Sequence, residues 1–370
     1  MGFTLGLVIN PFAGLGGAVG LKGSDGAEVV ARARRLGAHG NAPARALRAL
    51  QRLAGSQMEV ITATGELGEQ VCREAGIEAR VIGPPHPQGS ARDTQDACAA
   101  FLEEGVDLLL FAGGDGTARD VAQALAGAPQ PPPILGIPCG VKMYSGVFAL
   151  SPEHAGELAL RYASGRIDTQ EAELLDIDES ASRADRVSTR LHGYARVPAD
   201  RQHLQSAKAS GANPDRAAEA VAAAFAETLR GDHLYILGPG RTIQALAERL
   251  NGQATLLGVD AYLGRELVCR DASETELLAL AARHPTHVVV SVTGGQGCLF
   301  GRGNQQIGPR LLANLPADRL HVLASSAKIA ALPQGRLFVD SGDPQLDARL
   351  SGFIRVHTAP GRSAMVRVVH

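Results

Sequence analysis

The feature that most constrains the fold is an apolar run that leads directly into a glycine-rich turn. Val106–Ala112 (VDLLLFA) is a largely apolar segment of the kind that forms a parallel strand buried on both faces. The turn Gly113–Thr117 (GGDGT) follows without a break, and a helical pattern continues to Leu125. A buried strand, a short turn and a helix in this order predict one unit of an α/β fold, in which helices cover a parallel sheet.

Similar strand and helix segments alternate through the first half of the chain, so we expect an N-terminal Rossmann-like α/β domain over residues 1–167. Helical patterns such as Pro43–Ala54 separate the apolar runs. In that helix, Arg45, Arg48 and Arg52 form a stripe, which we interpret as a solvent-facing side rather than a phosphate contact. The other strand-like runs are Phe3–Asn10, Met58–Thr62, Glu78–Ile82 and Ile134–Ile137.

The pattern changes near residues 164–169, and we place a domain boundary there, between residues 1–167 and residues 168–370. Glu173–Ile177 and Val187–Val197 show the partial alternation of apolar and polar residues that is typical of antiparallel strands. Strand and helix patterns alternate again over Asp232–Val292. We therefore expect a second, mixed α/β domain that contains antiparallel β structure and completes the substrate cleft.

Composition excludes several classes of protein. Of the 370 residues, 45% are apolar and 20% are charged, which is typical of a globular protein and rules out disorder over most of the chain. The net charge of −2 does not fit a protein that wraps nucleic acid. No apolar run is long enough for a membrane helix. The five cysteines are scattered without a CxxC pair, so we expect a reduced, cytoplasmic location.

The turn Gly113–Thr117 has the composition of a phosphate-binding loop. Its glycines let the backbone approach a phosphate closely, and the amino terminus of the following helix attracts anions. Thr117 can cap the helix or bind a phosphate oxygen. Asp115 is the exception, because a carboxylate beside phosphate is repelled unless it takes a proton from an attacking hydroxyl or holds a magnesium ion. The alternative interpretation is a tight turn in which Asp115 only caps the helix.

The GGDGT turn after a buried strand resembles the motif of the NAD kinase and diacylglycerol kinase superfamily, and VINPFAGLGG (Val8–Gly17) is similar to its first strand and loop. Later segments resemble a narrower group, the ATP-NAD kinase family proteins that include the acetoin-catabolism protein X type. These segments are GIPCGVKMYSGVFA (Gly136–Ala149), LLDIDE (Leu174–Glu179), GYARVP (Gly193–Pro198), LGPGRT, LLGVDAY, GGQGCLFGRGNQQ (Gly294–Gln306) and VDSGDPQLDARLSGFIRV.

This resemblance implies a kinase that transfers a phosphoryl group from ATP, or from polyphosphate, to the 2′-hydroxyl of NAD and so produces NADP. By motif position, Asp115 would be the general base and Asn10 would lie near the nucleotide at the end of the first strand. Mg²⁺ would accompany ATP, and related kinases suggest a homo-oligomer. The phosphates would be lined by Gly113, Gly114, Gly116 and Thr117.

The sequence departs from ordinary NAD kinases in two respects. The Asn-Glu pair with which those enzymes hold their substrate has no clear counterpart after GGDGT, and Asp232–Val292 does not read as their β-sandwich. Two alternatives therefore stay open. One is a kinase for another small-molecule or lipid hydroxyl, and the other is a non-catalytic sensor of NAD(P) or ATP.

Three further places are candidates for phosphate contacts. Gly238, Gly240, Arg241 and Thr242 lie between a strand and a helix, where a second phosphate loop and a simple turn are equally consistent with the pattern. Gly294 and Gly295 open a glycine-dense segment that can also be a tight hairpin. Lys142 follows a strand of the first domain, at the edge where open sheets bind ligands. The eleven histidines show no metal-binding spacing, so no metal ligands are assigned.

Overall fold

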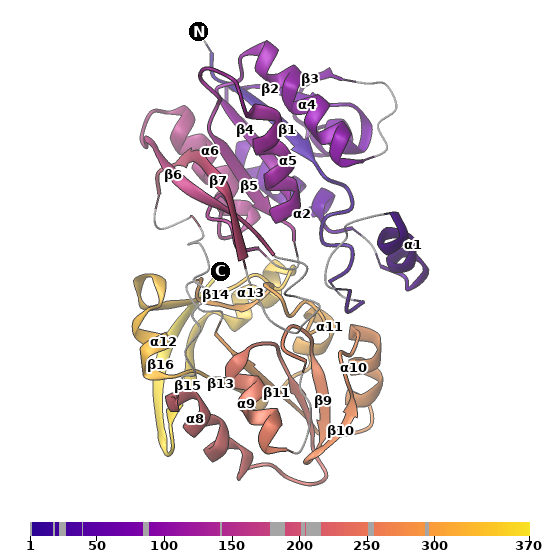
Figure 1. Ribbon diagram of the computed structural model, residues 1–370, viewed down its shortest axis with the longest axis vertical. Coiled ribbons are helices and arrows are strands. Elements are labelled where there is room, and N and C mark those ends of the chain that lie inside the picture. The colour runs from indigo at the N-terminus through magenta and orange to yellow at the C-terminus, as the bar shows by residue number, and fades with distance from the viewer. Residues whose placement is uncertain are drawn as a thin grey trace. The chain divides into compact units, whose positions relative to one another are not determined.

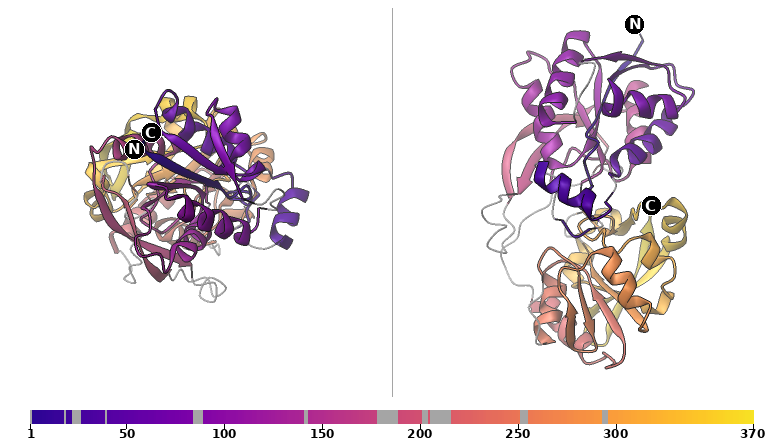
Figure 2. Two further views of the ribbon diagram at one scale, coloured as in Figure 1. Left: turned by 90° about the horizontal axis from the view of Figure 1, so that it is seen from above. Right: turned by 90° about the vertical axis from the view of Figure 1, so that its right-hand side faces the viewer.

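The chain divides into two compact units, and a computed structural model shows the architecture of each (Figures 1 and 2). The first unit contains Met1–Leu15, Ser24–Val30 and His39–Lys208, and the second contains Gly16–Gly23, Ala31–Ala38 and Ala209–His370. The structure describes residues 2–17, 19–21, 27–38, 40–83, 89–140, 143–177, 189–200, 204, 216–250, 255–292 and 296–370.

The first unit is built on a parallel sheet of five strands in the order β3-β2-β1-β4-β5. All four neighbouring pairs are parallel, and the central pair is in register from Leu5 opposite Leu108 to Ile9 opposite Ala112. The Rossmann-like sheet expected from the apolar runs is therefore confirmed. The strands are β1 (Thr4–Ile9), β2 (Glu59–Ala63), β3 (Ala79–Ile82), β4 (Leu108–Gly113) and β5 (Ile134–Pro138).

Helices connect these strands and bury their apolar sides against the sheet. Phe101, Phe111 and Phe148 are fully buried in this core. Helix α4 begins with a capping box between Ser90 and Asp93, which satisfies free amide groups at its amino terminus. The helices of this part are α1 (Ala27–Arg35), α2 (Ala42–Leu53), η1 (Gly65–Leu67), α3 (Glu69–Glu74), α4 (Ala91–Glu104), α5 (Asp115–Leu125) and α6 (Pro152–Ala163).

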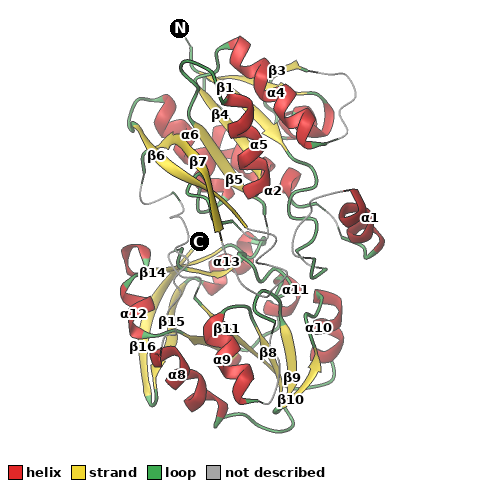
Figure 3. Cartoon of the chain, viewed as in Figure 1, coloured by secondary structure: helices red, strands yellow, loops and turns green. Residues whose placement is uncertain are grey.

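A two-stranded antiparallel hairpin follows α6, and it belongs to the first unit (Figure 3). Its strands are β6 (Thr169–Ile177) and β7 (Thr189–Pro198), which pack against α5 and β5. The first compact unit therefore includes this hairpin and extends to Lys208, and the domain boundary near residue 167 stays a prediction. The change of pattern near residue 167 marks the step from parallel to antiparallel pairing within one unit.

The second unit is a mixed sheet of nine described strands in the order β10-β9-β8-β11-β13-β15-β16-β14-β12. Strands β8, β11, β13 and β15 are parallel, whereas β9 and β16 run antiparallel to their neighbours β8 and β15. This arrangement confirms a mixed α/β fold with antiparallel strands. The strands are β8 (Leu234–Leu237), β9 (Asp260–Leu263), β10 (Glu266–Cys269), β11 (Thr286–Ser291), β12 (Cys298–Phe300), β13 (Leu320–Leu323), β14 (Arg336–Val339), β15 (Gly352–Ala359) and β16 (Arg362–Val369).

Helices of the second unit bury apolar residues on the sheet, among them Phe225 of α8 and Leu246 of α9. A capping box between Ser273 and Glu276 begins α10. Within the described ranges, no helix is long and apolar enough to cross a membrane. The helices are α8 (Arg216–Ala226), α9 (Arg241–Arg249), α10 (Glu274–Ala281), α11 (Pro309–Leu312), η2 (Ala317–Arg319), α12 (Ser326–Ala330), η3 (Pro333–Gly335) and α13 (Pro344–Leu350).

Candidate active site

The sheet of the first unit has a topological switch point between β1 and β4. From β1 the chain crosses to β2 and β3 on one side, and it then returns to β4 on the other side of β1. In open α/β sheets, ligands bind in the crevice at the carboxyl ends of the strands at such a point. Asn10 follows β1, and the Gly113–Thr117 turn joins β4 to α5, so both lie at this edge.

Asn10 connects the two sides of the switch point. Its backbone N–H donates to the carbonyl of Ala112, 2.9 Å away, and its side-chain oxygen accepts from the N–H of Phe12 at 3.0 Å. Its Nδ2 donates to Oγ1 of Thr117 at 3.0 Å. The structure therefore brings Asn10 and Thr117 together from distant parts of the sequence.

Close packing explains Gly113 and Gly114 of the turn. A Cβ atom on Gly113 would lie 2.4 Å from Cβ of Thr117, and one on Gly114 would lie 3.2 Å from Cα of Gly140. A side chain at Gly113 would therefore force a shift of Thr117, whose Oγ1 accepts from Nδ2 of Asn10. Because Gly114 has no side chain, the amino terminus of α5 can lie close to the loop after β5. Gly114 is the N-cap residue of this helix.

Asp115 does not cap the helix that it begins. Its Oδ2 accepts from the backbone N–H of Tyr144 at 2.7 Å, and its Oδ1 accepts from the N–H of Ser145 at 3.0 Å. The residue is 6% exposed. Burial raises the pKa of Asp115 to about 7, although hydrogen bonds from Ser145 and Tyr144 oppose this and the charge of Asp176 adds to it. A carboxylate with this pKa can accept a proton at neutral pH.

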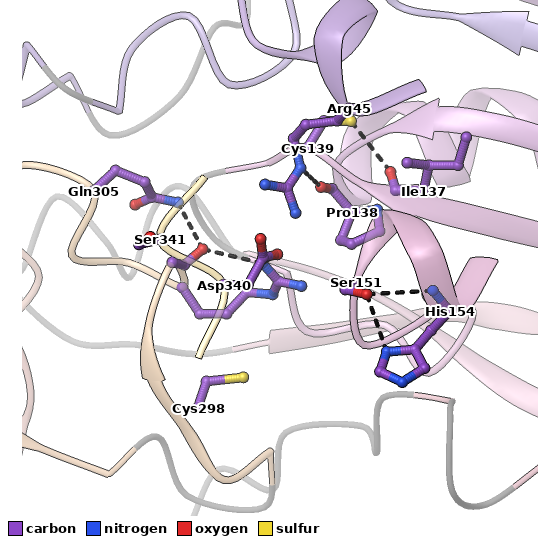
Figure 4. A network of polar contacts seen from close by, with 12 residues as sticks. Arg45, Ile137, Pro138, Cys139, Ser151, His154, Cys298, Gln305, Asp340 and Ser341 are labelled. Carbon is purple, nitrogen blue, oxygen red and sulfur yellow. Dashed lines mark hydrogen bonds and ion pairs between the residues drawn. The ribbon is translucent and has the colours of Figure 1, made fainter. Parts of the chain in front are cut away.

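Other polar groups at this edge hold the end of β5. Figure 4 shows the Arg45 guanidinium directed at the carbonyl of Pro138, to which its Nε donates. The Cys139 thiol donates to the carbonyl of Ile137 at 3.3 Å. Arg45 is 7% exposed, so the interpretation of this arginine as part of a solvent-facing stripe was wrong. Spacing on a helix does not show how closely a neighbouring strand end approaches it.

The residues around Asp115 that the sequence analysis missed are Tyr144 and Ser145. Their contribution to Asp115 is a pair of backbone amides, which no side-chain pattern reveals. The signals were the resemblance of Gly136–Ala149 to the family and a polar residue, Ser145, within the segment MYSGVFA. Lys142, the third candidate of this region, lies outside the described residues.

In the second unit, Gly238 and Gly240 lie at the carboxyl end of β8, and Gly240 is the N-cap residue of α9. Arg241 begins this helix and is exposed, whereas Thr242 is buried and its Oγ1 accepts from Nζ of Lys328 at 2.8 Å. The same Nζ donates to Oγ of Ser291 at 3.3 Å. Gly294 and Gly295 lie outside the described residues. The phosphate-binding roles of these residues stay predictions.

Gly14 shows that the first glycine-rich loop is tightly packed. Its φ angle is +78°, and an added Cβ would lie 2.2 Å from Oδ1 of Asn41 and 2.4 Å from the carbonyl oxygen of Cys139. We expect Gly14→Ala to lower the free energy of unfolding by about 2–4 kcal/mol, because strain and overlap add. Chemical denaturation measures this change.

Gly55→Ala is the matched control for this substitution. Gly55 has a φ angle of +81°, but an added Cβ would meet nothing within 4 Å. Gly55→Ala should therefore lower the free energy of unfolding only by the strain of the left-handed conformation, about 1 kcal/mol. Equal losses in the two variants would contradict the packing described for Gly14.

Two family models match the chain. The ATP-NAD kinase N-terminal domain matches residues 5–167, and the ATP-NAD kinase C-terminal domain matches residues 230–368. Together they span more than half of the sequence. No curated relative matches the chain.

Solved structures similar to part of the chain include two that are described as diacylglycerol kinases from Bacillus anthracis str. Sterne. Both are 16% identical to this chain over 48% of its length, with TM-scores of 0.25 and 0.23. The match covers 45% and 46% of those chains, so this chain spans about half of their length. At these TM-scores the likeness carries no argument about fold or substrate.

The fold places this chain in a class, the two-unit α/β proteins with a Rossmann-like N-terminal sheet. More narrowly, the chain belongs to the ATP-NAD kinase family.

Proposed function

We propose that this protein transfers the γ-phosphoryl group of ATP to the 2′-hydroxyl of the adenosine ribose of NAD, and so produces NADP and ADP. The observation that carries the proposal is the buried carboxylate of Asp115, which has a pKa of about 7 and lies at the amino terminus of α5 beside the GGDGT glycines. The two ATP-NAD kinase family models support NAD as the acceptor.

Asp115 acts as the general base in the proposed reaction. Its carboxylate takes the proton of the ribose hydroxyl while the hydroxyl oxygen forms a bond to the γ-phosphorus. The bond between that phosphorus and the oxygen bridging to the β-phosphate breaks, and its electron pair leaves with ADP. The amides of Tyr144 and Ser145 keep the carboxylate in one orientation throughout.

The phosphates bind at the amino terminus of α5. The backbone amides of Gly113, Gly114 and Gly116 offer donors there, and the helix dipole favours negative charge. Nδ2 of Asn10 donates a hydrogen bond to Thr117. This bond holds the loop after β1 at a constant distance from the amino terminus of α5. We also propose phosphate contacts for Lys142 and for Gly238, Gly240, Arg241, Thr242, Gly294 and Gly295.

Magnesium would enter with ATP in this proposal. Among the described residues, no group of three His, Cys, Asp or Glu side chains is arranged to hold a metal ion. Both oxygens of Asp115 already accept backbone N–H groups. These residues do not build a protein-held magnesium site, so we assign the ion to the phosphates of ATP, where it commonly binds. We also propose that the protein is cytoplasmic and forms a homo-oligomer.

A panel of acceptors tests which hydroxyl is phosphorylated. The purified protein is incubated with ATP and Mg²⁺, and ADP release is measured with NAD, with diacylglycerol in vesicles, and with no acceptor. NAD-dependent ADP release supports the proposal. Release that depends on the lipid instead would assign the protein to lipid phosphorylation, and ATP binding without any release would indicate a sensor.

The pH dependence of the reaction follows from the pKa of Asp115. Only the ionised carboxylate accepts a proton, so kcat/KM should be about tenfold lower at pH 6 than at pH 9 if the pKa is about 7. Initial rates between pH 5.5 and 9 measure this profile. A rate that stays constant down to pH 5.5 would contradict the role of Asp115 as base.

A further inference from the structure

The sheet of the second unit has a topological switch point of its own, between β8 and β11. From β8 the chain passes through α9 to β9 on one side, and after β10 and α10 it returns to β11 on the other side of β8. Strands β8 and β11 are parallel, so their carboxyl ends lie at one edge of the sheet. Open α/β sheets bind ligands at such an edge, so this is the place where the second unit can hold one.

Gln306 lies in a loop that reaches this edge. A Cβ atom added to Gly238, which follows β8, would lie 3.7 Å from Cδ1 of the neighbouring Ile307. Gln306 is 4% exposed, and its side-chain oxygen Oε1 is buried without a hydrogen-bond partner in the part of the chain that the structure describes. An unpaired buried polar atom is unfavourable, and most such atoms in proteins are paired. The amide of Gln306 therefore points to a ligand.

A small space lined by polar atoms lies beside this amide. Gly20, which belongs to the same unit, has a φ angle of +74°, and a Cβ atom added there would have three atoms within 4 Å. They are the carbonyl oxygen of Asp271 at 3.4 Å, the carbonyl oxygen of Ala272 at 3.9 Å and Nε2 of Gln306 at 4.0 Å. Because residue 20 has no side chain, the space has room for a ligand atom and offers it two acceptors and one donor.

The backbone of Asp271 has an uncommon conformation at this place. Its φ angle is +50°, which few residues other than glycine adopt. Its N–H donates to Oδ1 of Asp260 at 2.8 Å, and Asp260 is a buried residue at the start of β9. This bond helps to hold Asp271 in its conformation and so to direct its carbonyl group. Strained backbone is concentrated at ligand sites, which agrees with a binding role for this carbonyl.

We propose that Gln306 and the carbonyl groups of Asp271 and Ala272 bind a planar edge of the ligand in which an amino group lies next to a hydrogen-bond acceptor. The amino group donates to Oε1 of Gln306 and to a backbone carbonyl, and the acceptor accepts from Nε2. The carboxamide of nicotinamide and the amino edge of adenine both have this arrangement, and glutamine pairs with adenine in the same bidentate way. The inference rests on the proposed function for the choice of NAD and ATP as ligands.

Matched pairs of nucleotides identify the edge that is bound. Nicotinic acid adenine dinucleotide differs from NAD only by a carboxylate in place of the carboxamide, and ITP differs from ATP by a carbonyl in place of the amino group. Isothermal titration calorimetry of the full-length protein should show about tenfold weaker binding of the altered nucleotide in one pair, because its edge no longer matches the glutamine. A loss in the first pair assigns the site to nicotinamide, and a loss in the second assigns it to adenine.

Gln306→Met tests whether this residue makes the contact. Methionine has a similar length but neither the donor nor the acceptor of the amide, so the variant should bind both members of the pair equally. Without ligand, the variant should melt about 2 °C higher than the wild type, because an unpaired buried amide has been removed. Gln306→Leu should give the same two results if the methionine variant does not fold.

Asn304→Leu is the matched control in the same loop. Asn304 is 5% exposed, but both ends of its amide are paired. Its Nδ2 donates to the carbonyl of Leu299 at 2.9 Å, and its Oδ1 accepts from the N–H of Gly301 at 3.0 Å. This variant should melt lower than the wild type by about 2–4 °C, because its amide shapes the loop.

Discrimination between the paired nucleotides that persists in Gln306→Met, or a melting temperature that falls as in the control, would overturn the inference. Turnover tests the proposed function separately. A protein that binds NAD or ATP through Gln306 without phosphorylating NAD would contradict the proposed function alone. One that phosphorylates NAD but discriminates within neither pair would contradict the inference alone, and one that binds neither nucleotide would overturn both.

Discussion

Asp115→Asn should lower the rate of phosphoryl transfer by roughly 10²–10⁴-fold, the usual contribution of a positioned general base. The asparagine has nearly the same size, but its amide cannot take a proton from the acceptor hydroxyl. ATP should still bind, because the backbone amides of the glycine turn are not changed. Single-turnover kinetics measure the rate, and isothermal titration calorimetry measures ATP binding.

Asp107→Asn is the control for this substitution. Asp107 directly precedes β4, at the end of the strand opposite to Gly113, and its carboxylate also accepts a backbone N–H, that of Thr4 at 2.8 Å. It is exposed and far along the strand from the proposed site, so its variant should keep the wild-type rate. An Asp115→Asn protein that keeps a rate within tenfold of the wild type would show that Asp115 is not the base.

The second large effect is a loss of stability in acid, and it concerns four histidines on neighbouring parallel strands of the second unit. We call these residues the histidine row: His233, His287, His321 and His357. Nδ1 of His233 lies 2.8 Å from Nε2 of His287, and Nδ1 of His287 lies 2.9 Å from Nε2 of His321. Tyr235 stacks on His287, and Phe225 of α8 packs against His321 and His357.

Acid should destabilise the second unit through this row. Burial, together with the smaller effect of neighbouring histidines, lowers the pKa of His287 and of His321 to about 4. A histidine in the unfolded chain has a pKa near 6.5, so the unfolded state binds more protons as the pH falls. The contribution of the row to stability is therefore present above about pH 6.5 and is lost between pH 6.5 and pH 4.

The expected loss is on the order of 3 kcal/mol at pH 4, after a reduction because both rings are partly exposed to solvent. For a unit of this size, that loss lowers the melting temperature by about 10 °C. Asp318, Arg319 and Arg230 also face His287, and Arg355 faces His357. The cationic groups among them disfavour protonation of the row.

The double variant His287→Gln/His321→Gln separates the row from the carboxylates that also titrate in acid. Thermal unfolding followed by circular dichroism at pH 7 and pH 4.5 should show a smaller loss of melting temperature in this variant than in the wild type. His192→Gln, which changes an exposed histidine on β7, should behave as the wild type does. An equal acid loss in the double variant would contradict the role of the row.

Local patterns predicted much of the fold. The run Val106–Ala112 and the GGDGT turn correctly indicated a buried parallel strand followed by a helix, because burial on both faces and a tight turn each demand particular residue types. The family resemblance, and not a local pattern, placed Asn10 at the end of the first strand, where its side chain lies beside Thr117. A hydrogen bond between their side chains agrees with this.

Features that depend on distant parts of the chain were not predictable in this way. The amides of Tyr144 and Ser145 reach Asp115 because of the path of the backbone after β5, and residue type does not encode that path. The histidine row could not be predicted from the spacing of histidines in the sequence for the same reason. Its members are neighbours across strands and not along a helix. Arg45 was assigned to solvent because its partner, the carbonyl of Pro138, is distant in sequence.

The most direct test of the proposed reaction is ³¹P NMR of the wild-type protein with ATP, Mg²⁺ and NAD. The proposal predicts a new phosphomonoester signal at the 2′ position of the ribose, which grows as the γ-phosphate signal of ATP declines and which is absent with Asp115→Asn. A wild-type reaction in which ATP is consumed without that signal, or is not consumed at all, would contradict phosphorylation of NAD by this protein.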